Sequence, residues 1–366
     1  MNKKTISFVT LGCAKNTVYS EYMMGLITNS NYVLVDDPAN ANVIVVNTCG
    51  FITDAKEETI NTILDLNTFK EEGNCEFLIA IGCMVQKYAP EMEEALPELD
   101  LLLGSTTYDD IVHQIDKLYE GSNEKSQVDT SWHLPANSES EHRILSTPSY
   151  YAYLTIAEGC DNHCTYCIIP SVRGGIRSRP LSAIAEEAAA LAQAGFQELV
   201  LTGIHLTSYG RDLDGKPGLA EAVKAACVPG VSRIRLGSLE PRVATEAFVQ
   251  ELSKCAPVCP QFHLALQSGS DTVLRRMKRC YNTEQFRQAA ARLRSAWPMS
   301  AFTTDVIVGF PGETEEEFAE TIAFCREIGF ARLHVFPFSP REGTPAAVMD
   351  WSLRYPVDGE TEAENA

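Results

Sequence analysis

The sequence predicts an α/β protein in which an open parallel-sheet domain is followed by a partial, open (βα)6 barrel. Short apolar runs rich in β-branched residues recur along the chain, separated by polar segments with helical periodicity. The runs are apolar throughout rather than alternating, which is typical of parallel strands covered by helices on both faces. The length of 366 residues is enough for two or three domains.

The first 120 residues contain three such runs, at residues 6–11, 43–46 and 77–81. A polar segment with helical periodicity, such as residues 55–66, follows each run. We therefore expect residues 1–120 to form the open-sheet domain. Residues 121–149 are rich in Ser, Asn, Glu and Pro and are expected to be a linker.

The alternation of strands and helices resumes at residue 150 and gives six further strand candidates. They are residues 152–157, 198–203, 233–237, 262–267, 303–308 and 332–336. Six strands fall short of the eight of a closed barrel, so we expect a partial barrel over residues 150–349 and a tail at 350–366. Helical patterns cover residues 181–194 and 241–254, and Thr314 with Glu317 fits a capping box that starts another helix.

Charge and hydropathy limit the partners and the compartment. The net charge is −19, and residues 1–120 contain 7 Lys, no Arg and 19 Asp or Glu, a balance of −12. Because phosphate backbones favour patches of Lys and Arg, this domain suits a basic partner, unless its acidic faces only keep the protein soluble. No stretch reaches the length of a membrane span and the start lacks a secretory signal, so we expect a cytoplasmic protein with no membrane partner.

Twelve cysteines are too few for a disulfide scaffold in a chain of this length, and in a reducing compartment they indicate metal or redox chemistry. Cys160, Cys164 and Cys167 follow the first barrel strand directly, with the spacing C-x3-C-x2-C. Three thiolates on one loop can hold three irons of a [4Fe–4S] cluster and leave the fourth iron open to a substrate or cofactor. The alternatives are a zinc site that recruits His163 and cysteines that are simply buried.

Cys13, Cys49 and Cys83 each follow the end of a predicted strand in the first domain, beside Gly12, Gly50 and Gly82. Strand ends of one polarity lie along one edge of an open parallel sheet, so we expect these cysteines to converge on a second cluster. Small buried hydrophobic residues are the alternative. The remaining cysteines are interpreted as structural: Cys75, Cys227, Cys255, Cys259, Cys280 and Cys325.

With these two triplets the chain, to about Met349, resembles the methylthiotransferases of the radical S-adenosylmethionine superfamily. The resemblance implies two [4Fe–4S] clusters and S-adenosylmethionine as cofactors. The cluster on Cys160, Cys164 and Cys167 would bind S-adenosylmethionine, and an electron donor such as flavodoxin or ferredoxin would drive its cleavage to a radical that abstracts hydrogen from an unactivated C–H. The other cluster would present sulfur to the carbon radical, and a second S-adenosylmethionine would supply the methyl group.

Further segments fit this resemblance. Tyr166 stands where the superfamily places an aromatic residue against the cofactor, residues 201–203 (LTG) resemble the segment that contacts the methionine part, and residues 306–313 (VIVGFPGE) resemble the adenine-side segment. The implied cofactor-binding residues are Tyr166, Gly203, Gln267 and Gly309, and no catalytic residue is identified. Three arginines after the cluster loop could clamp a carboxylate or phosphate, or form ordinary salt bridges: Arg173, Arg177 and Arg179.

The two halves of the chain resemble different branches of the family. LGCAKN at 11–16, NTCGFI at 47–52 and AEGCD at 157–161 resemble the branch that modifies an aspartate of the twelfth protein of the small ribosomal subunit. LTGIHL at 201–206, RLGSLEP at 235–241 and LQSGS at 266–270 resemble the branch that acts on threonylcarbamoyladenosine beside the tRNA anticodon. A fusion of two paralogous genes, joined near Arg179, is one hypothesis. The acidic first domain favours the ribosomal protein as acceptor, with tRNA as the alternative.

Two other classes of protein stay open. The family's usual C-terminal RNA-binding β-barrel is expected to be absent, so the chain could be a truncated, inactive chimera that binds clusters without holding its acceptor. It could also be a non-enzymatic iron–sulfur protein, an electron carrier or cluster scaffold, although that role needs no barrel of cofactor-binding strands.

Overall fold

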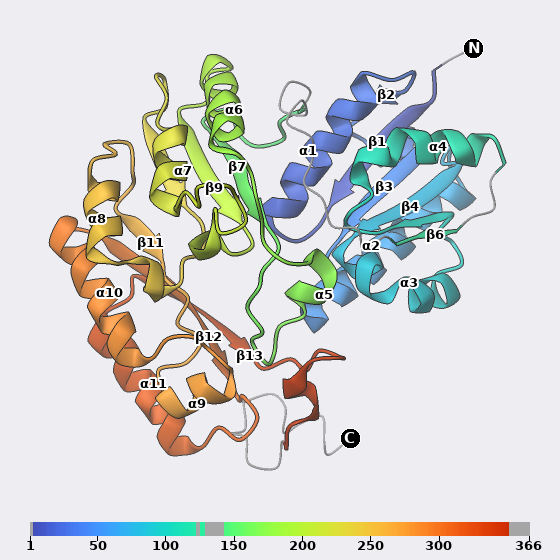
Figure 1. Cartoon of the computed structure of the whole chain (residues 1–366). Helices are drawn as coiled ribbons and strands as arrows, with labels where there is room; N and C mark the ends of the chain where they lie inside the picture. The colour runs from blue at the N-terminus through green and yellow to red at the C-terminus, as the bar shows by residue number, and fades with distance from the viewer. Residues whose placement is uncertain (1–2, 122–124, 129–142, 351–366) are drawn as a thin grey trace.

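The computed structural model describes residues 3–121, 125–128 and 143–350. Most of the predicted linker and nearly all of the predicted tail therefore lie outside the described residues. Figure 1 shows two bodies, an N-terminal domain in blue and cyan and a barrel that runs from green to red, with the short helix α5 between them. No helix within the described ranges is long and apolar enough to cross a membrane.

The N-terminal domain is built on a parallel sheet with the strand order β2-β1-β3-β4-β5-β6. Its strands are β1 (Thr5–Thr10), β2 (Val33–Leu34), β3 (Val43–Thr48), β4 (Phe77–Gly82), β5 (Leu101–Leu103) and β6 (Ser126–Gln127). The three strands predicted from the apolar runs are its centre. Strand β6 pairs in parallel with β5, so the sheet extends into the segment that composition predicts as a linker.

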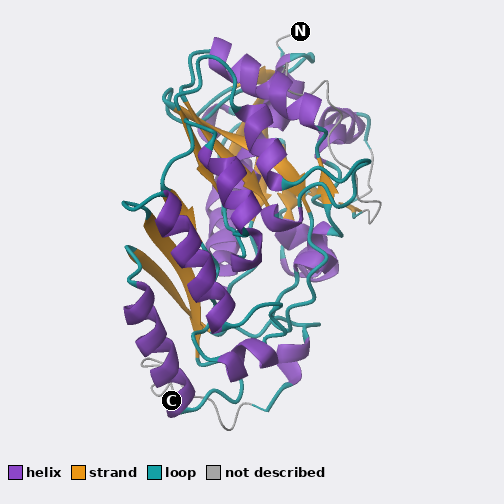
Figure 2. Cartoon of the chain, turned by 60° about the vertical axis from the view of Figure 1, so that its left-hand side comes forward, coloured by secondary structure: helices purple, strands orange, loops and turns teal. Residues whose placement is uncertain are grey.

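Helices cover both faces of this sheet, as the apolar strands predict. Successive side chains of a strand point to opposite faces. Val43 and Val45 therefore pack against α1 (Ala14–Thr28) and α4 (Ile111–Tyr119), whereas Ile44 and Val46 pack against α2 (Thr53–Glu71) and α3 (Cys83–Ala95). The strands lie between helices in the upper part of Figure 2.

The second body is the expected partial, open barrel. Its parallel strands are β7 (Tyr151–Glu158), β9 (Glu198–Gly203), β10 (Arg233–Leu236), β11 (Gln261–His263), β12 (Ala301–Val308) and β13 (Arg332–Pro337). They form one sheet of order β10-β9-β7-β8, in which β8 (Arg177–Ser178) runs antiparallel to β7, and a second of order β11-β12-β13. Parallel bridges such as Leu239 to Leu264 connect β10 to the β11 segment.

The barrel helices lie on the outer side of the strands in Figure 1. They are α6 (Leu181–Gln193), α7 (Leu219–Ala226), α8 (Glu246–Ser253), α9 (Asp271–Arg276), α10 (Thr283–Ala296) and α11 (Glu315–Ile328), and α5 spans Ile169–Arg173. The capping box of Thr314 and Glu317 at the start of α11 is confirmed. The predicted helix at residues 241–254 is too long, because Pro241 opens a separate 3₁₀ turn and Thr245 caps α8 by accepting from the Phe248 N–H at 3.2 Å.

Arg143 connects the two bodies. Its guanidinium donates to Glu21 of α1 at 2.8 Å and to Glu187 of α6 at 2.6 Å, and its side chain is 3% exposed. Replacing Arg143 by leucine leaves two buried carboxylates without this cation, so we expect the free energy of unfolding to fall by about 3–5 kcal/mol. Chemical denaturation measures this. Lys4→Met removes an exposed ion pair with Glu76 and should change stability by no more than about 1 kcal/mol; equal effects of the two variants would contradict the prediction.

Candidate active site

The loop that carries Cys160, Cys164 and Cys167 leaves the carboxyl end of β7. Gly159 has φ +72°, and a Cβ there would lie 1.8 Å from the Gly175 carbonyl oxygen, so the loop folds back closely only with glycine at this position. The Cys160 N–H donates to the Gly174 carbonyl at 3.0 Å and fixes that return. Backbone N–H groups also point at two of the thiols, from Asn162 to Cys160 Sγ and from Ile169 to Cys167 Sγ, each at 3.4 Å.

The three thiols act electrostatically on one another. The pKa of Cys160 is raised to about 12, mainly by burial and also by the neighbouring Cys167 and Cys164, while the Asn162 N–H acts to lower it. Burial also raises the pKa of Cys167. Deprotonating such a group costs free energy unless a cation takes the proton's place, and metal ligation deprotonates a thiol outright. The donor set thus fits an iron cluster with backbone N–H groups directed at its sulfur ligands.

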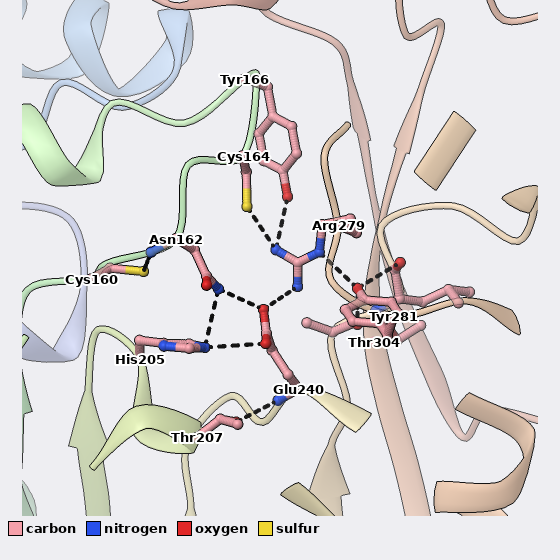
Figure 3. A network of polar contacts seen from close by, with 12 residues as sticks. Cys160, Asn162, Cys164, Tyr166, His205, Thr207, Glu240, Arg279, Tyr281 and Thr304 are labelled. Atoms are coloured by element: carbon pink, nitrogen blue, oxygen red, sulfur yellow. Dashed lines mark hydrogen bonds and ion pairs between the residues drawn. The ribbon is translucent and has the colours of Figure 1, made fainter. Parts of the chain in front are cut away.

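A buried polar network contacts this loop, and Figure 3 shows its members pointing toward one another. Glu240 is the centre of the network. It accepts from Asn162 Nδ2 at 2.9 Å and from Arg279 Nη2 at 2.8 Å, and it lies 3.3 Å from His205 Nε2. Arg279 in turn donates from Nη1 to Cys164 Sγ at 3.1 Å and from Nε to the Tyr281 hydroxyl at 3.0 Å.

Glu240 is ionised in this network. Burial opposes ionisation, but the hydrogen bond with His205 and the charge of Arg279 outweigh it and lower the pKa of Glu240. Glu240→Gln removes the buried charge that compensates Arg279, so we expect the free energy of unfolding to fall by about 3–5 kcal/mol at neutral pH. Because the pKa is lowered on folding, this contribution exists above the ordinary carboxyl pKa and is lost as the pH falls through the lowered one.

Chemical denaturation at neutral and at acid pH measures this prediction. Glu251 is partly exposed and pairs with Lys224 and Lys254. It provides the control substitution Glu251→Gln, for which we expect little change in stability. A Glu240→Gln protein as stable as its parent at neutral pH would contradict the prediction.

Two adjacent cavities open beside the cysteine loop. One of about 140 Å³ is lined by all three cysteines, Glu240 and Arg279, and one of about 190 Å³ lies toward Ile52 and Arg341. Tyr166 and Gln267, both predicted to bind the cofactor, line both cavities. Gln267 has φ +69°, a conformation that non-glycine residues rarely adopt and that often accompanies function.

The other two predicted cofactor-binding residues lie just outside these cavities. Gly203 ends β9, one residue before the cavity-lining Ile204, and Gly309 follows β12, where its N–H donates to the Glu313 carboxylate at 2.7 Å. Neither glycine is among the residues that line the two cavities. The structure thus places Tyr166 and Gln267 in the cavities, and the roles of Gly203 and Gly309 stay predictions.

Cys13, Cys49 and Cys83 meet at the carboxyl edge of the N-terminal sheet. Cys13 precedes α1, Cys49 follows β3, and Cys83 is the first residue of α3 after β4. Gly12 has φ +88°, and a Cβ on it would lie 2.9 Å from Cys49 Sγ, which shows how closely the β1 and β3 loops approach. Cys13, Cys49 and Cys83, although distant in the sequence, lie close enough to act electrostatically on one another.

The electrostatics of this second site are uneven. Burial raises the pKa of Cys83 to about 11, although the adjacent Arg173 opposes the shift. Burial also acts to raise the pKa of Cys13, but Lys15 and Arg173 outweigh it, so the net shift is downward. The Cys13 thiol therefore loses its proton more readily than an ordinary cysteine, which suits the binding of a metal.

The three arginines after the cysteine loop do not form a clamp for an anion. Arg173 reaches the N-terminal domain and donates to Cys83 Sγ at 2.9 Å. Arg177 donates to the backbone carbonyls of Arg173 and Gly175, and Arg179 forms a buried ion pair with Glu187. Arg179 therefore forms an ordinary salt bridge, which was the alternative. Arg173 instead lies at the contact between the two bodies, where it reaches Cys83.

The zinc alternative finds no geometric support. His163 is exposed, and among residues 3–121, 125–128 and 143–350 no three His, Cys, Asp or Glu side chains gather around one point that could hold a single metal ion. A cube with three cysteine ligands spreads them over three irons, so it does not need that convergence. Cys75 lies at the amino end of β4, where its thiol donates to the Phe77 carbonyl, at the opposite edge from Cys83.

Sequence patterns do not reveal several residues of the site: Asn16, Asn162, His205, Glu240, Arg279 and Arg341. Arg341 Nε donates to the Phe51 carbonyl at 2.5 Å and its Nη1 to the Tyr166 carbonyl at 2.9 Å, so it joins the loop after Cys49 to the loop before Cys167. The sequence gives only a weak indication of these residues. Glu240 lies in the RLGSLEP segment and Arg279 in a basic run, and neither has a spacing typical of metal or cofactor ligands.

Comparisons with known families match the N-terminal domain and the barrel separately. A model of the Radical SAM superfamily matches residues 154–325, and a model described as "Uncharacterized protein family UPF0004" matches residues 5–104. The chain is 42% identical over 345 residues to "Ribosomal protein uS12 methylthiotransferase RimO" of Lachnoclostridium phytofermentans, which covers 94% of this chain and 78% of that protein. The chain belongs to the radical SAM methylthiotransferases.

Other methylthiotransferases of the same name match with similar extent. The protein from Geobacter sulfurreducens is 42% identical over 95% of this chain and 77% of its own length, and the one from Anaeromyxobacter sp. (strain Fw109-5) is 44% identical over 93% and 72%. These matches include both sides of Arg179, so the N-terminal and C-terminal halves are each similar to proteins of this one name. As a methylthiotransferase the chain is an enzyme, and the family's S-adenosylmethionine and [4Fe–4S] clusters are its cofactors.

Solved structures share the fold at low identity. The radical S-adenosylmethionine methyltransferase TsrM from Kitasatospora setae, with cobalamin and a [4Fe–4S] cluster bound, superposes with a TM-score of 0.70 at 12% identity, over 94% of this chain and 77% of that chain. The cobalamin-dependent enzyme OxsB superposes with a TM-score of 0.59 at 15% identity, over 88% and 52%. A parallel-sheet domain joined to a partial barrel is thus an arrangement that this methylthiotransferase shares with other radical enzymes.

Proposed function

We propose that this methylthiotransferase replaces a C–H of ribosomal protein uS12 by C–S–CH3. The observation that supports this acceptor best is the similarity, at 40–45% identity over 93–96% of the chain, to relatives named as uS12 methylthiotransferases. The acidic first domain, with no arginine in residues 1–120, adds a physical argument, because ribosomal proteins that bind RNA are basic.

We further propose a division of the chemistry between the two cysteine sites. Cys160, Cys164 and Cys167 hold the cluster whose open iron binds S-adenosylmethionine, and Tyr166, Gly203, Gln267 and Gly309 surround the cofactor. Cys13, Cys49 and Cys83 hold the second cluster. When bound, these groups supply a reducing electron, a carbon-centred radical and sulfur. In terms of domains, residues 1–120 carry the second cluster and residues 150–349 the first, with residues 121–149 as linker.

The chain's own residues orient and enclose these groups. Arg279 and the Asn162 N–H donate to cysteine sulfurs of the barrel loop, and Glu240 holds both residues in place. Arg341 ties Tyr166 to Phe51, so the 190 Å³ cavity has walls from both bodies. An acceptor side chain that enters this cavity meets the barrel site on one side and the loop after Cys49 on the other.

The acceptor is tested by anaerobic reconstitution of the full chain with iron and sulfide. The holoprotein is incubated with S-adenosylmethionine, a chemical reductant and either purified uS12 or bulk tRNA, and methylthio incorporation is scored by mass spectrometry. We expect modified uS12 and unmodified tRNA. Modification of tRNA alone would replace the proposed acceptor by the alternative, and modification of neither, with S-adenosylmethionine still cleaved, would identify a chain that does not hold its acceptor.

The reductant is part of the same proposal. A small flavodoxin or ferredoxin would deliver the electron, because cleavage needs a low-potential one-electron donor and the described residues provide no redox group other than the two cysteine sites. Replacing the chemical reductant by either protein in the uS12 assay tests this. Turnover only with the chemical reductant would contradict it.

A further inference from the structure

Arg173 belongs to the barrel by sequence but lies in the cysteine site of the N-terminal domain. It is the last residue of α5, and its guanidinium donates to Cys83 Sγ from Nε at 3.2 Å and from Nη2 at 2.9 Å. Nη2 also donates to Asn16 Oδ1 at 3.1 Å, three residues after Cys13. The residue is 3% exposed, so a full positive charge is buried among the three thiols.

The carboxylate nearest to this charge is not positioned to neutralise it fully. Glu158 Oε2 lies 3.8 Å from Arg173 Nη1, which is beyond hydrogen-bond distance. Within the described residues, Nη1 and both carboxylate oxygens of Glu158 have no hydrogen-bond partner. The Tyr19 ring lies 4.8 Å from the guanidinium carbon and adds a cation–π contact. The direct hydrogen bonds of the cation therefore go to the cysteine sulfur and to Asn16.

The backbone around Arg173 is held at both ends. Helix α5 begins two residues after Cys167, and the Ile169 N–H points at the Cys167 sulfur. Ser105, in the loop after β5 of the N-terminal domain, donates from its hydroxyl to the Val172 carbonyl at 2.9 Å. One short helix thus spans from a thiol of the barrel site to a thiol of the N-terminal site.

We propose that Arg173 is a positioning residue that completes the N-terminal cluster site: its buried guanidinium holds the Cys83 thiolate and raises the reduction potential of the cluster bound there. The inference rests on the proposed binding of a cluster by Cys13, Cys49 and Cys83. Reduction adds negative charge to a cluster, and net charge, hydrogen bonds to sulfur and solvent exposure set its potential. A buried cation that donates to a ligand sulfur therefore favours the reduced form.

The barrel site also contains a buried arginine that donates to a cysteine sulfur, so the effects of the two arginines can be measured separately. Arg279, with a side chain 8% exposed, donates to Cys164 Sγ in the same way, but Glu240 pairs with it at 2.8 Å. Each cysteine triplet thus has one buried arginine on one of its sulfurs. Because the two arginines donate to sulfurs of different triplets, replacement of one should act mainly on the cluster of its own triplet.

The test uses the full chain with Cys160, Cys164 and Cys167 replaced by alanine, so that iron and spectroscopic signals come from the N-terminal site alone. Into this parent are introduced Arg173→Met, Arg173→Lys and, as a matched buried control, Arg179→Met, because Arg179 is buried and pairs with Glu187 rather than with a cysteine. Iron content, electron paramagnetic resonance of the reduced protein and the midpoint potential from an anaerobic redox titration are measured. Circular dichroism and thermal unfolding monitor the fold.

We expect Arg173→Met to shift the midpoint potential to more negative values and to change the resonance spectrum. Arg173→Lys, which keeps the charge but not the forked donor, should restore the potential in part, and the control Arg179→Met should match the potential of the parent. Loss of iron from Arg173→Met that Arg173→Lys rescues would also support the proposal.

Other outcomes overturn it. If Arg173→Met keeps its iron, potential and spectrum, Arg173 has no role at the cluster. If both Arg173 variants lose their folded structure, the residue is a structural interface residue only. If the parent itself binds no iron, the cluster assignment of Cys13, Cys49 and Cys83 fails and this inference fails with it, whereas an unchanged Arg173→Met protein overturns the role of Arg173 alone.

Discussion

Replacing Cys160, Cys164 and Cys167 by alanine is expected to abolish cleavage of S-adenosylmethionine and to remove about four of about eight irons from the reconstituted protein, if both clusters are cubes. The reason is the position of these thiols. They leave the carboxyl end of a barrel strand, where folds of this kind keep their reactive groups, and they line one wall of the 140 Å³ cavity. Alanine offers no ligand for iron, so the electron has no route to a bound cofactor.

Iron counting and chromatography of released 5′-deoxyadenosine check this prediction. A protein with Cys280 and Cys325 replaced by alanine is the control, because Cys280 is exposed and Cys325 lies on α11, away from both cysteine sites. The control should keep its iron and its cleavage rate. Cleavage at the parent's rate in the triple variant would show that the radical chemistry resides elsewhere.

Replacing Cys13, Cys49 and Cys83 by alanine should have the complementary result. We expect about four irons to remain, cleavage of S-adenosylmethionine to continue, and methylthio product to fall to background. The two sites are built by separate bodies of the structure, so loss of one leaves the ligands of the other in place. In the proposed division of the chemistry the N-terminal cluster presents the sulfur, so its loss should uncouple cleavage of S-adenosylmethionine from methylthio transfer.

The measurement compares 5′-deoxyadenosine with methylthiolated acceptor in the same reaction. Cys75→Ala is the matched control, since Cys75 belongs to the same domain but lies at the opposite end of β4 from Cys83. Normal product from the triple variant would contradict a role in sulfur delivery. Loss of cleavage as well would show that the two sites depend on each other more strongly than Arg173 and Arg341 alone imply.

Contacts from three arginines connect the two bodies of the structure. Arg143 pairs with Glu21 and Glu187, Arg341 links the Phe51 and Tyr166 carbonyls, and Arg173 reaches Cys83. All three arginines follow residue 120, whereas that first segment contains no arginine. The C-terminal part of the chain thus supplies guanidinium groups to an acidic domain that has none of its own.

Prediction succeeded where a local pattern has one structural outcome. The strands with continuous apolar runs, the capping box at Thr314 and the order of sheet domain and barrel are confirmed, because periodicity and capping act over a few residues. It failed at residues 241–254, where Pro241 splits the expected helix, and it missed β6, which consists of two residues that pair only because β5 provides an edge.

The sequence by itself determined the order of the sheet domain and the barrel, and it predicts two triplets of thiols: one from the spacing on a single loop, the other from recurrence after successive parallel strands, whose ends share an edge. Only the tertiary structure decided which charged side chains contact those thiols or hold the residues that do. Arg173, Arg279 and Glu240 act across distances of about 40 to 115 residues. Such contacts arise where segments distant in the sequence pack together, and no periodicity or spacing along the chain encodes them.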